Sequence, residues 1–173
     1  MYNNSTNGDV FCEVLVSRKR GSSETLKTGV AIAAGIVLSA AIILLIPMFF
    51  ILLIPVWALI VFVIRMQKIE YEYSFTSGDL DIDALIGNYK RKHRMSLSME
   101  TMTLIAPENS HDLDGFRGNP NYHHYDFGAN DVMQQDYIII GNCNNQQVWV
   151  KFTPNERLMD DMFRISPGKV RRR

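Results

Sequence analysis

Three histidines stand close to aspartates in one polar stretch of the 173-residue chain. They are His111, His123 and His124, with Asp112, Asp114 and Asp126 beside them. Imidazole and carboxylate groups together are ligands for zinc and other divalent ions. The spacing fits no closed structural site, and stretches rich in Asn, Asp and His are common on protein surfaces. We therefore expect a surface loop here and no bound metal.

A row of carboxylates occupies alternate positions at Asp79, Asp81 and Asp83. Residues two apart share one face of a strand, so this row would bind a cation or a basic partner, or form a solvated outer face. We expect the solvated face. The chain has no glycine-rich phosphate loop, no GxSxG motif and no catalytic Cys/His spacing, and Cys12 and Cys143 form no disulfide framework. The sequence predicts a protein that is not an enzyme and needs no cofactor.

Positive charge gathers in short runs, although 18 Lys and Arg residues balance 18 Asp and Glu residues over the whole chain. Beside a membrane, each such charge is attracted to anionic lipid by about 1 kcal/mol. The lipid-contact candidates are Arg18, Lys19, Arg20, Lys90, Arg91, Lys92 and Arg94. The alternative is that these charges are solvated or only set the orientation in the membrane. Nucleic-acid binding would need aromatic residues interleaved with the charge, so we expect lipid and not nucleic acid as a partner.

An apolar block determines where these side chains lie. Residues 29–64 form 36 consecutive positions without a charge, which as one helix would reach about 54 Å, against a hydrocarbon core of about 30 Å. Two helices, at about 25–46 and 50–65, fit better, with the reversal at Ile46-Pro47-Met48-Phe49 because proline breaks a helix. One tilted span with an extra buried stretch is the alternative.

Basic residues stand on both sides of this block, and positive charge prefers the cytoplasmic side of a membrane. An even number of crossings satisfies both ends at once. We therefore expect a multi-pass protein of the plasma membrane, with both termini and the C-terminal domain in the cytoplasm. The apolar block of residues 29–64 contains no ionisable residue, which argues against an ion pathway.

Small residues recur every fourth position in the first span, at Ala31, Gly35 and Ser39. Such a face allows close approach of two membrane helices. We expect it to pack against the second span of the same chain. The alternative is a contact with a second copy or with another subunit.

The polar part of the chain predicts an α+β domain over residues 66–168, between the helical hairpin of residues 25–65 and a basic tail at residues 169–173. A polar segment of residues 1–24 precedes the hairpin, and its residues 9–19 are either a helix or a strand. Alternating apolar residues predict strands at 69–76, 80–86, 95–98, 100–105, 137–140 and 147–152, with a weak edge strand at 122–127.

A C-terminal amphipathic helix follows these strands. Thr153-Pro154-Asn155-Glu156 predicts its start as a capping box. Its apolar face comprises Leu158, Met159, Met162, Phe163 and Ile165, and the water-facing residues are Arg157, Asp160, Asp161 and Arg164. Antiparallel strands that end in one such helix predict a bent sheet or partial barrel closed by that helix.

The pattern Tyr71-x-Tyr73-x-Phe75-Thr76-x-Gly78, followed by Leu80-x-Ile82, a turn at Gly87 and a basic strand, resembles bacterial pleckstrin-homology-like (PH-like) domains in small two-span membrane proteins. The resemblance covers residues 25–168 and implies a helical anchor before a strand-rich domain. A long polar insert at residues 107–136 departs from the pattern. The resemblance implies architecture more than activity.

Two functions fit these expectations. In the first, the domain mediates protein interaction or membrane-surface association through an unknown partner, which includes a second copy. In the second, the chain is an accessory subunit of a larger membrane complex, assembled through its helices.

Overall fold

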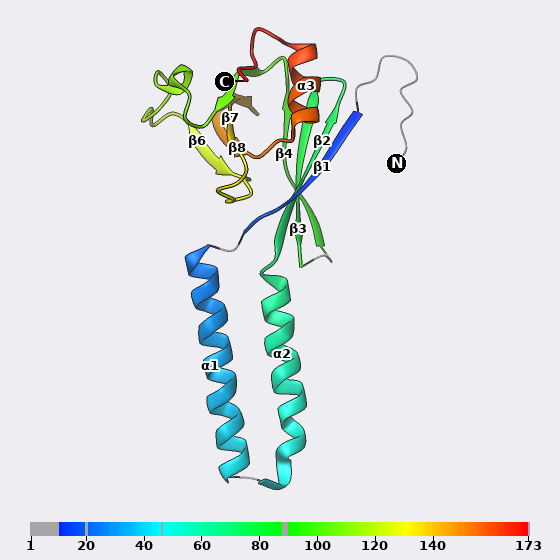
Figure 1. Cartoon of the computed structure of the whole chain (residues 1–173), viewed down its shortest axis with the longest axis vertical. Coiled ribbons are helices and arrows are strands. Elements are labelled where there is room, and N and C mark those ends of the chain that lie inside the picture. The colour runs from blue at the N-terminus through cyan, green and yellow to red at the C-terminus, as the bar shows by residue number, and fades with distance from the viewer. Residues whose placement is uncertain (1–10, 20, 46, 88–89, 173) are drawn as a thin grey trace.

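A pair of long helices projects from one end of a strand-rich domain in the computed structural model (Figure 1). The structure describes residues 11–19, 21–45, 47–87 and 90–172. The N-terminal residues, Arg20, Ile46 and Arg173 therefore lie outside the described residues, and with them one lipid-contact candidate and part of the expected reversal.

The helical pair consists of α1 (Ser22–Leu45), the short 3-10 helix η1 (Pro47–Leu52) and α2 (Leu53–Met66). Within the described residues, one helix, Glu24–Leu45, is long and apolar enough to cross a membrane, and Leu53–Met66 is shorter. The second helix was expected to start at residue 50. It starts three residues later because Pro47 is followed by a 3-10 segment, and Pro55 lies in the first turn of α2, where a missing N–H donor costs little.

Sheet 1 contains β1 (Phe11–Ser17), β2 (Ile69–Thr76), β3 (Asp79–Ile86) and β4 (Lys90–Ser98) in that order, each antiparallel to its neighbour. Cys12, Val14 and Val16 alternate inward along β1, so residues 9–19 contain a strand. The domain was predicted to begin at residue 66. It instead begins at β1, and both helices are inserted between its first two strands.

Strand β4 is longer than the predicted 95–98, because the basic run from Lys90 onward continues the pairing with β3. Ile82 pairs with Met95, whereas the next residue, Asp83, pairs with His93. Arg94 is therefore an extra residue in β4, a β-bulge that shifts the register by one position.

Sheet 2 contains β5 (Met102–Pro107), β7 (Tyr137–Cys143), β8 (Gln146–Phe152) and β6 (His123–Asp126), in the order β5-β7-β8-β6. The expected edge strand in the insert is present. It runs parallel to β8, whereas the other neighbouring strands of the two sheets are antiparallel. A 3-10 turn, His111–Leu113, lies earlier in the insert.

Helix α3 (Glu156–Ile165) ends the fold, and it begins two residues later than the capping box predicted. Asn155 is the N-cap and accepts a hydrogen bond from the Leu158 N–H at 2.8 Å. Thr153 does not cap the helix because its hydroxyl donates to Asp136 and accepts from the Ala129 N–H. Asp161 was expected to face water and is instead buried.

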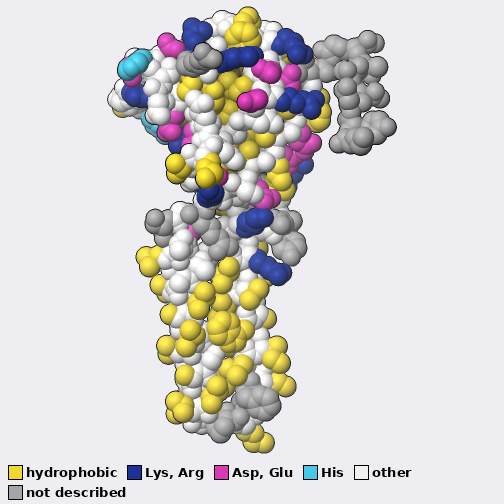
Figure 2. Space-filling model, viewed as in Figure 1, with side chains coloured by type: hydrophobic (Ala, Val, Ile, Leu, Met, Phe, Trp, Pro, Cys, Tyr) yellow, Lys and Arg dark blue, Asp and Glu magenta, His cyan; other side chains and the backbone are white. Residues whose placement is uncertain are grey.

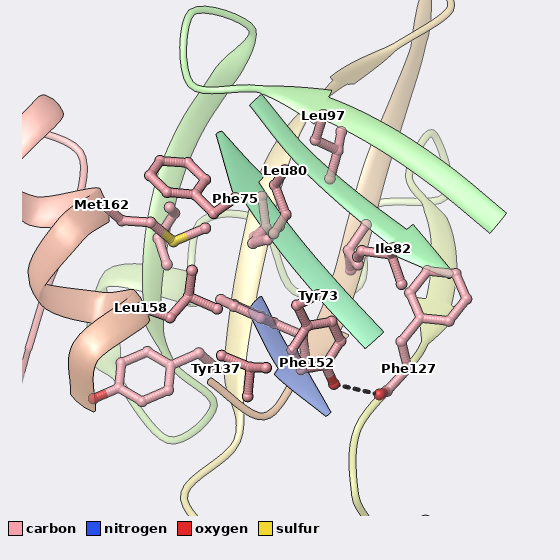
Figure 3. Close-up of a cluster of buried hydrophobic side chains, with 14 of the residues drawn as sticks. Tyr73, Phe75, Leu80, Ile82, Leu97, Phe127, Tyr137, Phe152, Leu158 and Met162 are labelled. Carbon is pink, nitrogen blue, oxygen red and sulfur yellow. Dashed lines mark hydrogen bonds between the residues drawn. The ribbon is translucent and has the colours of Figure 1, made fainter. Parts of the chain in front are cut away.

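The main core lies between the two sheets and α3. Tyr73, Phe75 and Leu80 have no exposed surface, and Leu158 and Met162 of α3 point into the same cluster (Figure 3). The Tyr73 hydroxyl donates a hydrogen bond of 2.7 Å to the Phe127 carbonyl oxygen, and burial raises the pKa of this tyrosine far above its usual range. The core therefore holds the insert in place through a buried polar contact.

Candidate membrane-proximal site

Three chain segments meet where the helices join the domain: the end of β1, the start of β2 and the turn between β3 and β4 (Figure 1). Gly87, in that turn, has a φ of +61°, and a Cβ there would lie 3.2 Å from the Met66 Cα. Its N–H donates to the Lys68 carbonyl oxygen at 2.8 Å. Glycine thus allows the β3–β4 turn to rest on the end of α2, so β4 starts beside the helices.

Several cations at or near this junction are exposed and form no ion pair with other described residues. We call Lys27, Arg65, Lys90, Lys92 and Arg94 the junction cations. Figure 2 shows Lys and Arg side chains where the apolar helical surface ends and the mixed surface of the domain begins. Three of the sequence-predicted lipid-contact residues, Lys90, Lys92 and Arg94, belong to this group.

The other lipid-contact candidates that the structure describes, Arg18, Lys19 and Arg91, have carboxylate partners. The Arg18 guanidinium lies 3.1 Å from an Asp126 carboxylate oxygen and 3.2 Å from the Tyr71 hydroxyl. Lys19 lies 2.7 Å from Asp131, and its ammonium group lowers the pKa of that carboxyl. These two cations therefore fasten the insert to the end of β1, which enters α1.

Arg91 joins two acidic residues on the outer face of sheet 1. Its guanidinium lies 2.6 Å from Glu72 on β2 and 2.7 Å from Asp83 on β3. Burial opposes ionisation of Asp83, but hydrogen bonds from Arg91 and His93 outweigh it and lower the Asp83 pKa. Contact with Glu13, followed by burial, raises the pKa of Glu72. The aspartate row is thus an outer face, as expected, but Asp83 is paired with Arg91 of β4 and Asp81 accepts a hydrogen bond from Ser96.

Sequence reasoning missed this pairing, although a signal was present. Cross-strand ion pairs require acidic residues at alternate positions of one strand and basic residues at alternate positions of the next. The aspartates of β3 and the residues Arg91 and His93 of β4 have this spacing. The Arg94 bulge conceals the match, because without it the register would put different residues opposite the aspartates.

Asp83, His93 and Ser96 are linked by side-chain contacts, as an activated serine nucleophile would require. His93 Nδ1 lies 2.8 Å from Asp83 Oδ1, and His93 Nε2 lies 3.2 Å from the Ser96 hydroxyl. A nucleophilic serine must give its proton to the imidazole. The Ser96 hydroxyl instead donates to Asp81, so this group is a surface hydrogen-bond network and not an activated nucleophile.

The small-residue face of α1 contacts α2 of the same chain. Gly35 is buried, and a Cβ there would lie 2.3 Å from the Ile60 Cδ1 atom. The Trp57 indole N–H donates to the Ser39 hydroxyl at 3.2 Å, while Ala31, one turn earlier than Gly35, is half-buried. The two helices run antiparallel and pack closely along this face.

The insert packs against sheet 2 around a second, smaller core. Leu113 of the insert is buried there with Leu104 of β5 and Ile138 of β7, and Trp149 of β8 packs against them half-buried. His124 stacks on it at 5.5 Å between ring centroids. No group of His, Cys, Asp or Glu in the described part of the chain could hold a metal ion.

Two four-stranded sheets closed by a C-terminal helix, with an apolar helical pair between the first two strands, define a PH-like α+β domain with a helical insertion. The chain belongs to the family described as bacterial PH-like domain (DUF6106), whose model matches residues 8–172. The match includes both β1 and the helices. No match to the chain was found among curated proteins or among solved structures.

Proposed function

We propose that this chain is a non-enzymatic membrane protein with two membrane-spanning helices, whose PH-like domain lies at the cytoplasmic surface of the plasma membrane and mediates association with lipid headgroups and other proteins. One observation carries this proposal. Ser17 at the end of β1 pairs with Glu70 near the start of β2, so the chain between them leaves and re-enters the domain at one place. A segment pinned in this way crosses a membrane an even number of times.

The length of the second helix is compatible with a crossing. The 14 residues of α2 rise about 21 Å, and the 6 residues of η1 add up to about 12 Å. Together they reach at most about 33 Å, against a hydrocarbon thickness of about 30 Å, so that the start of η1, with Met48, would lie at the far surface of the membrane. The side chains agree, because Leu44 of α1 and Ile54 of α2 are 81% and 70% exposed and would be solvated by lipid.

The junction cations support a contact between the domain and anionic headgroups. Lys27, Arg65 and Lys90 lie near the domain end of the apolar helices, and Lys92 and Arg94 follow within four residues of Lys90 along β4. Near a membrane surface each such charge contributes up to about 1 kcal/mol of attraction. Because they lack carboxylate partners among the described residues, their charge is available to lipid.

Labelling of single cysteines tests the topology. Two variants each carry one cysteine. Cys12→Ala replaces a side chain that is 3% exposed and leaves Cys143 on the domain. The combined change Cys12→Ala, Cys143→Ser, Met48→Cys places the one cysteine in η1, on a side chain that is 87% exposed. A membrane-impermeant maleimide applied to intact, wall-stripped cells should label Met48→Cys, and Cys143 should react only after permeabilisation. Denaturation controls for burial. Labelling of Cys143 in intact cells would place the domain outside and reject the proposal.

Hydrogen exchange tests the lipid contact. In nanodiscs that contain anionic lipid, amide exchange over β4 should be slower than in zwitterionic nanodiscs. The triple change Lys90→Ala, Lys92→Ala, Arg94→Ala should abolish that difference. A matched control changes Arg157 and Arg164, exposed cations on α3 at the end of the domain away from the helices (Figure 1). Equal exchange in both lipids for the unaltered chain would contradict the lipid contact.

Assembly through α1 is less well supported. The face formed by Ala31, Gly35 and Ser39 is already in contact with α2 of the same chain, so it is not free for another subunit.

A further inference from the structure

Three of the four outer strands in the two sheets are protected against pairing with another chain. An unprotected strand edge presents backbone donors and acceptors to any extended peptide. Strand β4 carries the basic run and the bulge at Arg94, and β6 has only 4 residues. The outer edge of β5 is covered by the C-terminal segment, where the Ile105 N–H donates to Lys169 and the Arg171 N–H donates to Ile105.

Among the described residues, strand β1 has none of these protections. It has 7 residues, FCEVLVS, with no proline and no cation, and it forms the edge of sheet 1. In an antiparallel pair, the backbone groups of every second residue point toward the partner strand, and those of the residues between them point away. The Arg18 N–H donates to the Ile69 carbonyl oxygen and so points toward β2. The backbone groups of Glu13, Leu15 and Ser17 therefore point away from β2. Among the described residues, no backbone hydrogen bond reaches Glu13 or Leu15 on that side.

A groove of about 870 Å³ runs along this edge, between β1, the start of α3 and the end of the insert. Val14, Val16 and Met159 contribute apolar surface, and Glu156 and Asp160 contribute carboxylates. Asp160 is paired with Arg172 at 2.8 Å, whereas Glu156 forms no ion pair with a described residue. Leu15 beside the groove is 58% exposed. The groove therefore suits apolar side chains and one positive charge.

We propose that the β1 edge binds an extended segment of another protein, which adds to sheet 1 as an antiparallel strand with alternating apolar side chains and a basic residue near Glu156. The proposal rests on the proposed function, since it specifies how the domain contacts a protein at the membrane. Main-chain hydrogen bonds to Glu13 and Leu15 would provide affinity, and the groove would select the side chains.

A second copy of the chain does not suit this site. Two antiparallel β1 strands are related by a two-fold axis perpendicular to them, whereas two copies in one membrane share an axis along the membrane normal. Because β1 runs toward the helices (Figure 1), antiparallel pairing would direct the two helical pairs in opposite directions. The occupant is therefore a segment of a different protein.

A labelled heptapeptide in which valine alternates with lysine and threonine is the probe, and the full chain in zwitterionic nanodiscs is the receptor. Leu15→Pro should weaken binding roughly tenfold, because it removes an outward N–H and obstructs the edge. It leaves the ladder to β2 intact, since the Leu15 N–H does not point toward β2. Leu15→Thr, which keeps the N–H, should bind the peptide as the unaltered chain does.

Peptide variants test the site without altering the protein. Methylation of alternate backbone nitrogens should weaken binding to the unaltered chain, and replacement of lysine by glutamate should do the same. Equal binding of the methylated peptide, or of the Leu15→Pro chain, would overturn the proposal. A disulfide between two Leu15→Cys chains that competes with the peptide would assign the edge to a second copy and also overturn it. Maleimide labelling separately decides the topology, so failure of one proposal is distinguishable from failure of the other.

Discussion

The helical pair and the strand domain place their apolar residues in opposite ways. In α1 and α2 the large apolar side chains face outward, as with Leu44 at 81% exposed, whereas in the domain Leu80 is fully buried. Figure 2 shows the result: hydrophobic side chains along the visible face of the helices and charged side chains of both signs on the domain. The hydrophobic effect stabilises only the second arrangement in water, and the first fits the lipid surroundings that we propose for the helices.

What holds each region together also differs. The helices contact each other through small residues and one indole hydrogen bond, contacts that are also typical of helix pairs in membranes. The domain combines a large apolar core with ion pairs such as Lys151–Asp136, at 2.9 Å, and the Arg91 network. Substitutions of the same type should therefore have unequal effects in the two regions.

The same leucine-to-alanine change should have its most unequal effects in the domain and in the helical pair. Leu80→Ala should lower the free energy of unfolding of the domain by about 2–5 kcal/mol, because it leaves a cavity in a close-packed core. Leu44→Ala, at an exposed position, should change it by less than about 0.5 kcal/mol. Denaturant titration in detergent micelles, followed by Trp149 fluorescence in a Trp57→Phe background, measures both. Similar effects from the two variants would contradict the contrast.

Two glycines of α1 provide a second matched pair, this time within the helices. Gly35→Leu should separate α1 from α2 at a cost of about 1–3 kcal/mol, because a Cβ at this position would already meet Ile60 at 2.3 Å. Gly29→Leu should have little effect, since no atom lies within 4 Å of its Cβ position. Loss of the Trp57–Ser39 contact should shift Trp57 fluorescence in a Trp149→Phe background for the first variant only. A shift with Gly29→Leu alone would show that the helices pack through another face.

The two regions should also respond differently to acid. The pKa values of Glu70 and Asp131 are lowered in the folded chain, for Glu70 by Lys68 and the Ser17 hydroxyl and for Asp131 by Lys19. A lowered pKa gives stability that is complete above the ordinary value and is lost as the pH falls through the folded value. Glu72 acts in the opposite sense because its pKa is raised.

Thermal unfolding of the domain should therefore shift to lower temperature as the pH falls from about 5 to 3, across the ordinary carboxyl range. The contact between α1 and α2, which have no ionisable residue at positions 29–64, should show no shift over the same range. Glu70→Gln should flatten the response of the domain. An unchanged domain midpoint between these pH values would exclude these ion pairs as a source of stability.

Local patterns predicted most strands and the final helix, because alternation and capping residues act over a few positions. Between β2 and β3, Ser77 and Gly78 have positive φ, 51° and 104°, as a tight hairpin requires. The position of β1 was not predictable in this way, since its partner lies more than fifty residues away across the helices. Likewise, Thr153 fits a capping box by type, and only the fold brings Asp136 to its hydroxyl. The pairing of cations depends on register, which the bulge at Arg94 alters.

Two adjacent cations in β4 provide the smallest and most specific test. Arg91→Ala should lower the unfolding midpoint of the domain, because Glu72, whose side chain is 7% exposed, loses its guanidinium partner. Lys92→Ala should leave stability within about 0.5 kcal/mol of the unaltered chain, since Lys92 has no ion pair among the described residues. Its effect should instead appear as a weaker response of β4 to anionic lipid, of at most about 1 kcal/mol. If Lys92→Ala lowered the unfolding midpoint as much as Arg91→Ala did, the division between paired cations and junction cations would be wrong, because both side chains would then serve the fold.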